Sequence, residues 1–246
     1  MTRELKESGA GLRLYDTVDS TNTEAKRYTL DGGETPAVFL AETQTAGRGR
    51  MGRSVFSPDG TGIYLTVLRR CEGALSDGVL LTTAAAVAVR RAILRVTGIS
   101  TEIKWVNDLL LNGKKVAGIL AESFPHEGQL YLILGVGVNL STADFPEELS
   151  SVAGSLRPGE NGLRNELAAA LANELLSLGW APSPDSFIDE YRAASAVLGK
   201  RVTYLRNGIR REGIASEIDG RGRLTVVHDD GSRVLLSEGE ITLRLA

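Results

Sequence analysis

The stretch "LLLNGKKVAGILAES", residues 109–123, predicts two strands joined by a tight hairpin turn. Asn112 and Gly113 supply the positive φ angles that a two-residue type I′ turn requires. Neighbouring residues in a strand point to opposite faces, so one of Lys114 and Lys115 must face the apolar side beyond the turn. An inward lysine is costly unless it meets an anion. The alternative is that both lysines extend to water at the hairpin end, and the strand pattern alone does not separate these arrangements.

Outward from the hairpin, predicted strands and helices alternate along the chain. Residues 129–140, "QLYLILGVGVNL", are apolar on both faces and are therefore expected to form a central strand. The helix "STNTEAKRYTL" is expected to begin with a capping box formed by Thr21 and Glu24. The other strands are expected at Leu12–Asp16, Ala37–Glu42, Gly62–Arg70 and from Thr101, and the other helices at Ser76–Gly98, Gly162–Trp180 and Ser186–Leu198.

The pattern changes near Leu198. From Arg201 onward, short strands are separated by the turn signals Asn207-Gly208, Asp219-Gly220 and Asp230-Gly231. A spacing of about ten residues between such signals predicts a small closed barrel. The chain is therefore expected to fold as an α/β domain, residues 1–195, followed by a small β-barrel, residues 196–246.

Composition limits the class of protein. The 246 residues are 42% hydrophobic, with neither a run long enough to cross a bilayer nor a secretory signal at the N-terminus. Cys71 is the single cysteine, so no internal disulfide can form. These features predict a soluble, cytoplasmic protein without membrane partners. The net charge of −3 argues against a protein that mainly binds nucleic acid, and the histidine and cysteine positions do not suit a zinc site.

The segment "QTAGRGRMGRSVFSP", residues 44–58, has the glycine spacing of a dinucleotide-binding turn at Gly47, Gly49 and Gly52. Such a turn must open a helix, because the pyrophosphate of a dinucleotide sits on the helix N-terminus. Val55 and Pro58, with further glycines behind them, oppose a helix here. A Walker A motif is also excluded, since no G-K-[ST] follows.

The same segment is then predicted to form a glycine-rich loop that carries Arg48, Arg50 and Arg53. Guanidinium groups make planar, bidentate contacts to carboxylate and phosphate. The loop is either a solvated basic segment or one that closes over an anionic ligand. The stretch "KWVND", residues 104–108, adds a lysine, an amide and a carboxylate at a strand end. Gly118, Gly135 and Gly137 mark either close approach of backbone to a ligand or tight strand packing.

Several motifs in series resemble those of biotin protein ligases. "DSTN", "QTAGRGRMGR", "SPDGTGIYLT", "KWVNDLLLNGKKVAGIL" and "GVGVN" occur in the order and rough spacing of that family. The tail, with "LGKRV", "GIASEIDGRGRLTV" and "SEGEITLRL", is similar to its C-terminal SH3-like barrel. The resemblance spans about residues 12–245. It implies an α/β (α+β) fold, with a mixed-sheet biotin/lipoate ligase-like catalytic domain before the barrel.

The resemblance implies an ATP-dependent ligase. Such an enzyme joins biotin and ATP to form biotinyl-5′-AMP and pyrophosphate, with Mg²⁺, and then passes the biotinyl group to one lysine of a biotin carboxyl carrier domain. The default acceptor is the biotin carboxyl carrier protein of acetyl-CoA carboxylase or a related carboxylase. Dimerisation is common in the family. The chain begins directly before the first catalytic strand, so we expect no winged-helix DNA-binding domain and no operator-binding repression.

The resemblance also assigns site residues. Lys115 is expected to lie between the biotin carboxylate and the α-phosphate and to act in catalysis with Arg48 and Arg50, whose loop closes over the adenylate. Asp108 is the candidate ligand for Mg²⁺. The expected biotin-binding residues are Ser20, Thr21, Asn22, Gln44, Arg48, Gly49, Arg50, Lys115, Gly118, Gly135 and Gly137. The expected ATP-binding residues are Arg48, Arg50, Arg53, Lys104, Asn107 and Asn139.

Some features depart from the family or fit other proteins. Val55 stands where the family usually has a tryptophan beside adenine, and Val106 stands where it usually has proline. The residues Ser20 to Asn22 could also be a plain helix cap. Lipoate–protein ligase shares the catalytic fold, although its arginine- and glycine-rich segment usually differs. A nucleic-acid-binding protein that uses the arginine loop and the barrel is the alternative from another class, and the net charge of −3 counts against it.

Overall fold

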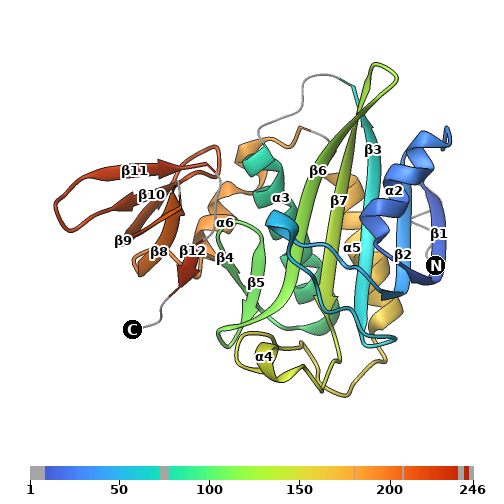
Figure 1. The fold of residues 1–246 in the computed structure, drawn as a ribbon, viewed down its shortest axis with the longest axis horizontal. Helices are drawn as coiled ribbons and strands as arrows, with labels where there is room; N and C mark the ends of the chain where they lie inside the picture. The colour runs from blue at the N-terminus through green and yellow to red at the C-terminus, as the bar shows by residue number, and fades with distance from the viewer. Residues whose placement is uncertain (1–8, 73–77, 180, 207, 238–240, 244–246) are drawn as a thin grey trace.

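The computed structural model describes residues 9–72, 78–179, 181–206, 208–237 and 241–243. They form a larger sheet covered by helices and a smaller sheet beside it (Figure 1). The start of the helix predicted from Ser76, the residue Asn207 of one predicted turn and parts of the C-terminal tail lie outside the described residues. Within the described ranges, no helix is long and apolar enough to cross a membrane.

The larger sheet has seven strands and confirms the predicted hairpin. Asn112 and Gly113 have φ angles of 52° and 77°, as a type I′ turn requires. The strands lie in the order β1-β2-β3-β7-β6-β5-β4, so β7 is central, as predicted. Only the pair β1–β2 is parallel. The strands are β1 (Gly11–Val18), β2 (Ala37–Gln44), β3 (Gly62–Cys71), β4 (Glu102–Lys104), β5 (Asp108–Leu111), β6 (Lys114–His126) and β7 (Gln129–Asn139).

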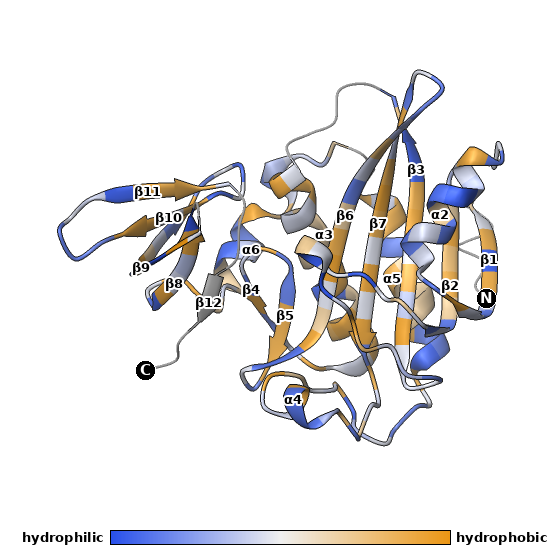
Figure 2. Ribbon diagram, in the orientation of Figure 1, coloured by the Kyte–Doolittle hydropathy of each residue, from blue (hydrophilic) through white to orange (hydrophobic). Residues whose placement is uncertain are grey.

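Helices cover the two faces of this sheet unequally. The long helices α3 (Gly78–Thr97) and α5 (Arg164–Ser177) pack on one face, where most of the core lies. The helix α2 (Thr21–Leu30) packs on part of the other face, over a small cluster that includes Phe39 and Ile133. The central strands β3 and β7 are largely hydrophobic (Figure 2), as burial between two layers requires. The remaining helices are α4 (Glu147–Ser150) and α6 (Ile188–Ala193), with short 3₁₀ turns at Arg50–Gly52 and Pro184–Ser186.

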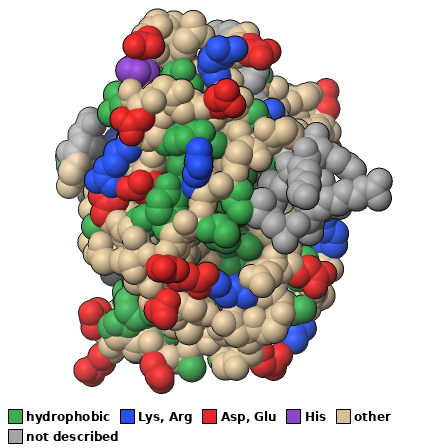
Figure 3. All heavy atoms as spheres, turned by 90° about the vertical axis from the view of Figure 1, so that its right-hand side faces the viewer, with side chains coloured by type: hydrophobic (Ala, Val, Ile, Leu, Met, Phe, Trp, Pro, Cys, Tyr) green, Lys and Arg blue, Asp and Glu red, His purple; other side chains and the backbone are tan. Residues whose placement is uncertain are grey.

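The side of the molecule that carries β1 is the less covered edge of the large sheet. Apolar side chains gather on this side between charged groups (Figure 3). Leu14, on β1, is 65% exposed. The edge is unlike the centre of the sheet, where strand residues are buried on both faces.

Two local predictions were wrong. The capping box at Thr21 and Glu24 does not form: Ser20 is the N-cap residue without a side-chain cap, and the Glu24 carboxylate pairs with Arg27. The helix predicted over Ser186–Leu198 is shorter, because the chain after α6 joins β4 instead. The amide of Ile103 donates to Ala194 O at 2.7 Å, and the amide of Ala196 donates to Ile103 O at 2.8 Å.

The smaller sheet contains five antiparallel strands in the order β11-β10-β9-β8-β12. Among the described residues no ladder joins β11 to β12, so the closure predicted for the barrel is not seen in its hydrogen bonds. A turn forms at the predicted Asp219-Gly220 signal, and Gly222 is its residue with a positive φ angle. The strands are β8 (Arg201–Arg206), β9 (Ile209–Ile218), β10 (Leu224–Val227), β11 (Arg233–Leu236) and β12 (Ile241–Leu243).

The smaller sheet packs against the turn between β4 and β5. The indole nitrogen of Trp105 donates to Gly222 O, in the β9–β10 turn, at 2.8 Å. The Tyr191 hydroxyl, on α6, donates to Val106 O at 3.1 Å, and Arg192 Nε donates to Ile218 O at 2.7 Å. The residues directly before Asn107 and Asp108 are therefore held by groups from α6 and the smaller sheet.

Candidate active site

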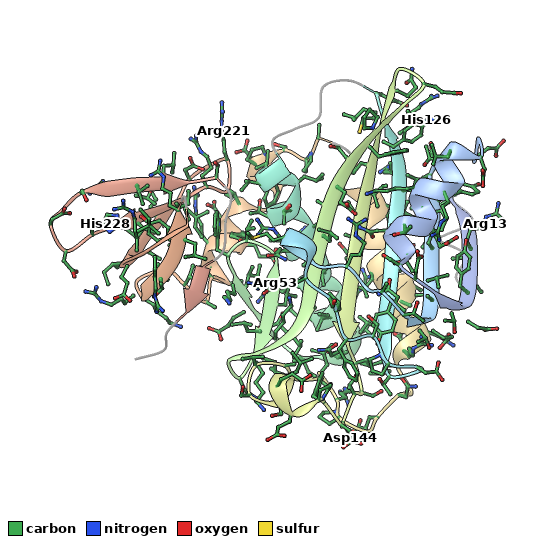
Figure 4. All side chains as sticks on the ribbon, viewed as in Figure 1. Arg13, Arg53, His126, Asp144, Arg221 and His228 are labelled. Carbon is green, nitrogen blue, oxygen red and sulfur yellow. The ribbon has the colours of Figure 1, made fainter. Side chains whose placement is uncertain are left out.

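A cavity of about 410 Å³ lies on the face of the large sheet that carries α2. The loop between β2 and β3 crosses in front of this face, and Arg53, labelled in Figure 4, comes from that loop. Every residue that the sequence predicted for the site lines this one cavity. They are Ser20, Thr21, Asn22, Gln44, Arg48, Gly49, Arg50, Arg53, Lys104, Asn107, Asp108, Lys115, Gly118, Gly135, Gly137 and Asn139.

At one end, which we call the amide end (Ser20, Thr21, Asn22 and Gln44), polar side chains are bonded to one another. Gln44 Oε1 accepts hydrogen bonds from the Thr21 amide at 2.9 Å and the Thr21 hydroxyl at 3.2 Å. The hydroxyl of Thr66, on β3, lies 2.6 Å from Asn22 Oδ1 and 2.8 Å from Thr21 Oγ1. Since Thr21 and Asn22 are only 3–4% exposed, these bonds fix the geometry of their side chains.

Glu122, on β6, anchors the amide end from outside the cavity lining. Its carboxylate accepts a hydrogen bond from Asn22 Nδ2 at 2.8 Å and one from Lys26 Nζ at 2.9 Å. Arg48 lies 3.5 Å away. Burial alone raises the pKa of Glu122, but the bonds from Asn22 and Lys26 and the charges of Lys26 and Arg48 outweigh it, and the pKa lies below its usual value. Glu122 is therefore an anion at neutral pH.

The three glycines predicted to allow close approach have different neighbours. A Cβ atom at Gly135 would lie 2.2 Å from Asn22 Oδ1, so this glycine makes room for Asn22. A Cβ atom at Gly118 would lie 3.0 Å from Lys115 Nζ, so this one makes room for the lysine. A Cβ atom at Gly137 would meet no atom within 4 Å and would point into the open cavity. Only Gly137 leaves space that a ligand can fill.

At the other end, which we call the cationic end (Arg48, Arg50, Lys104 and Lys115), the inward lysine of the hairpin is Lys115. Its Nζ lies 2.7 Å from Asp108 Oδ1, whereas Lys114 Nζ donates to Ser150 O at 2.9 Å. The β5–β6 ladder pairs Leu109 with Ala117 but Leu110 with Lys115, so β6 contains one extra residue. A bulge of this kind redirects the side chains that precede it. The Lys115 side chain is 45% exposed, in the open cavity.

The arginine loop has the shape of an extended segment with one tight turn. Met51 and Gly52 have φ angles of 57° and 74°, and no α-helix follows. The structure thus agrees with the sequence-based exclusion of a dinucleotide-binding turn, which would need a helix after Gly52. Arg50 donates to Asn107 Oδ1 at 3.2 Å, so the loop is tied to the β4–β5 turn. Asn107 in turn donates through Nδ2 to Ile119 O at 3.0 Å.

An aromatic pair on the cavity wall escaped the sequence analysis. The rings of Phe56 and Phe145 lie 6.2 Å apart at an angle of 55°, and both line the cavity beside Val55. Phe56 is 37% exposed. Its position directly after Val55 was the available signal. No signal linked it to Phe145, which comes from the segment after β7.

The metal-binding capacity of the cavity is small. Asp108 is the one acidic side chain among the described residues of its lining, and it already faces Lys115. Across the described ranges, no three histidine, cysteine or acidic side chains are placed so that they could hold a metal ion together. Mg²⁺ at nucleotide sites takes one or two carboxylates and completes its shell with phosphate and water. The residues thus fit a metal that arrives with a nucleotide, not one held by the protein alone.

Comparisons with known protein families divide the chain as its two sheets do. Residues 14–139 match the family described as "Biotin/lipoate A/B protein ligase family". Residues 197–244 match the "Biotin protein ligase C terminal domain". The first match contains nearly all the cavity residues named above, and the second contains strands β8 to β12.

Related proteins and structures agree with these matches. The chain is 36% identical over 250 residues to a biotin--[acetyl-CoA-carboxylase] ligase of Mycobacterium tuberculosis, covering 95% of this chain and 90% of the relative. It is 39% identical over 151 residues to the bifunctional ligase/repressor BirA of Bacillus subtilis, covering 60% of this chain but only 46% of that relative. An arginine-to-glycine mutant of the Aquifex aeolicus biotin protein ligase, in complex with biotin, superposes with a TM-score of 0.81 at 26% identity, covering 96% and 99% of the two chains.

Proposed function

Because the chain belongs to the biotin protein ligase family, we propose that it activates biotin with ATP and attaches it to a lysine of a carrier protein. The observation that carries this proposal is the single cavity with two chemically different ends. The amide end offers buried hydroxyl and amide groups, and the cationic end offers Arg48, Arg50 and Lys115. This combination suits a ligand with a neutral, hydrogen-bonding head and a reacting carboxylate.

In the proposed first step, a carboxylate oxygen of biotin bonds to the α-phosphorus of ATP, and the bond to the β-phosphate oxygen breaks, releasing pyrophosphate. Two anions must meet, so cations are needed where charge develops. Lys115 is the residue proposed to stand between them, because it points into the cavity and is half-exposed. Asp108 Oδ1, 2.7 Å from Lys115 Nζ, holds the lysine side chain in place until the ligands bind. Asp108 would be the protein ligand of a Mg²⁺ ion bound to the ATP phosphates, and such an ion would neutralise part of their charge.

The ureido head of biotin is proposed to bind at the amide end. That head is neutral and has fixed donors and acceptors, so it suits a rigid set of hydroxyl and amide groups. The open space over Gly137 would take the ring system. Gly118 and Gly135 support the site indirectly, since their missing side chains leave room for Lys115 and Asn22.

The adenine of ATP is proposed to lie against Phe56 and Phe145. Family members usually place a tryptophan where this chain has Val55, so the stacking surface must come from another residue. Both phenylalanines line the cavity, and Phe56 presents an exposed ring. Aromatic rings stack on every base because each base has a π-face. Lys104, Arg53, Asn107 and Asn139 are proposed to surround the phosphates and the nucleoside.

In the second step, the amine of the carrier lysine attacks the acyl carbon, the bond to the phosphate oxygen breaks, and AMP leaves as the amine loses a proton. The acyl-phosphate must be kept from water before this step. Arg48 and Arg50 are proposed to close over it with the glycine-rich loop. The proposed acceptor is a biotin carboxyl carrier protein of acetyl-CoA carboxylase or a related carboxylase, in the cytoplasm. The supporting observation is the name shared by the relatives of Mycobacterium tuberculosis and Paracoccus denitrificans.

The proposed domain boundary is near residue 195, just before the C-terminal family match at 197. A homodimer stays a prediction. Lipoate–protein ligase is the closest competing function, because one family match covers both activities. The match to a biotin ligase C-terminal domain favours biotin.

The decisive experiment incubates the protein with an apo carrier domain, MgATP and biotin, and measures the carrier mass. A gain of one biotinyl group is expected. No gain, while a known biotin protein ligase succeeds in parallel, would remove the proposal. Pyrophosphate exchange supported by lipoate and not by biotin would reassign the enzyme to the lipoate reaction.

A further inference from the structure

The Glu122 carboxylate joins three different elements beside the amide end. It lies on β6, its bonded partners Asn22 and Lys26 lie on α2, and Arg48 lies on the loop. Its side chain is 18% exposed and does not belong to the described lining of the cavity. Glu122 therefore acts on a ligand only through its neighbours.

The contact with Asn22 decides which way the Asn22 amide faces. An ionised carboxylate only accepts hydrogen bonds, so the group that faces Glu122 Oε2 at 2.8 Å must be the Nδ2 donor. The amide oxygen then faces Thr66 Oγ1 at 2.6 Å. Gly135 leaves the space in which that oxygen sits. Turning the amide over would place Nδ2 against the sheet and oxygen against oxygen at Glu122.

The orientation of the Asn22 amide also constrains the hydrogen bonds of Thr66 and Thr21. The Thr66 hydroxyl has one proton, and when this proton is given to Asn22 Oδ1 it is not available to Thr21. The Thr21 hydroxyl then directs its own proton to Gln44 Oε1, 3.2 Å away, or back to Thr66. The Glu122 carboxylate thereby sets which atoms of Asn22 and Thr66 donate and which accept.

We propose that Glu122 is a positioning residue for biotin, which holds the Asn22 amide in the orientation that the ureido head requires. The proposal rests on the proposed function and deepens it. Lys26 and Arg48, the cations that face Glu122, keep the carboxylate ionised. Neither cation orients the Asn22 amide, because Lys26 bonds Glu122 at Oε1 whereas the Asn22 amide bonds it at Oε2, and Arg48 lies 3.5 Å from Oε1.

The test compares the whole protein with Glu122→Ala, Glu122→Gln, Asn22→Ala and the double variant Glu122→Ala/Asn22→Ala. Calorimetry gives the Kd for biotin without ATP, and pyrophosphate exchange gives the KM for MgATP. Glu122→Ala should weaken biotin binding roughly tenfold, since a misdirected amide leaves buried polar groups unpaired, and should leave the KM for MgATP unchanged. Glu122→Gln should lose less, because its amide oxygen still accepts from Asn22.

The double variant separates positioning from general packing. If Glu122 acts through Asn22, adding Glu122→Ala to Asn22→Ala should cause no further loss of biotin affinity. Lys26→Met is the matched control, because it removes the other bonded partner of Glu122 and should leave the biotin Kd unchanged. Additive losses, an equal loss in Lys26→Met, or parallel losses of biotin and ATP binding would overturn the role of Glu122. Absence of biotin binding by the unmodified protein would instead overturn the proposed function itself.

Discussion

The amide end and the cationic end of the cavity prepare for their ligands in opposite ways. Ser20, Thr21 and Asn22 are 3–4% exposed, and the latter two are bonded to neighbouring side chains. The side chains of Arg48 and Lys115 are each 45% exposed. Buried neutral groups can be preorganised because their hydrogen bonds are satisfied within the protein. Arg48 and Lys115 each face one carboxylate of the protein and remain about half exposed, so they can also meet an incoming anion.

The largest expected effect tests the cationic end alone. Lys115→Met should lower the rate of adenylate formation by about 10²- to 10³-fold, as loss of one preorganised charge at a reacting centre does elsewhere. The biotin Kd should change far less than this rate, because the amide end is untouched and only the contact of Lys115 with the biotin carboxylate is lost. Lys114→Met is the control, since that neighbour bonds Ser150 O and should keep full activity. Equal loss in both variants would mean that the hairpin, and not the Lys115 charge, matters.

A smaller effect is expected from substitution of Arg48, in the glycine-rich loop that is proposed to close over the adenylate. Arg48→Gly should still form the adenylate but release it to solvent faster, by about tenfold or more, since the loop excludes water and retains the intermediate. Rapid filtration or quenched-flow measurement of bound and free biotinyl-AMP gives the rate. Arg48→Lys, which keeps the charge, should lie between the two. Unchanged retention in Arg48→Gly would show that Arg48 has no part in closure.

Gly135 and Gly137, two residues apart on β7, should respond differently to substitution by alanine in their free energy of unfolding and in biotin binding. Gly135→Ala should lower the free energy of unfolding by about 1–3 kcal/mol, because the new methyl group overlaps the buried Asn22 amide. The new methyl group of Gly137→Ala meets open space. The free energy of unfolding should therefore be nearly unchanged, while biotin binding weakens. Denaturant unfolding and calorimetry distinguish the two. Equal stability of both variants would show that the Asn22 amide is free to move.

The smallest effect is a pH dependence of stability at the amide end. The pKa of Glu122 is lower in the folded protein than its usual value, so its ionised form stabilises the fold above the unfolded-state pKa. That contribution is lost as the pH falls below the unfolded-state pKa and through the folded one. The difference in unfolding free energy between the unmodified protein and Glu122→Gln should thus be constant near neutrality and shrink in acid. A difference that grows on acidification would contradict the assignment.

Local sequence signals predicted much of this architecture and left specific parts open. The Asn112-Gly113 turn and the doubly apolar β7 depend on neighbouring residues, so they could be recognised directly. The choice between Lys114 and Lys115 depends on one extra residue in β6, which no alternating pattern reveals. The contact between Asn22 and Glu122 joins residues 100 positions apart. Likewise, Thr21 was predicted to form a capping box, but its hydroxyl donates to Gln44 Oε1, which is 23 residues away in the sequence.

The hydrogen bond between Trp105 and Gly222 links the larger sheet to the smaller one. Removing the smaller sheet would leave the indole N–H of a residue that is now 3% exposed without its acceptor, next to the turn whose Asn107 holds Arg50. We therefore expect that the two matched segments, 14–139 and 197–244, depend on each other for stability. A chimera with another C-terminal segment should therefore place a carbonyl oxygen where Gly222 O lies. Otherwise the turn that carries Asn107, and with it the contact of Asn107 with Arg50, is expected to be less well held.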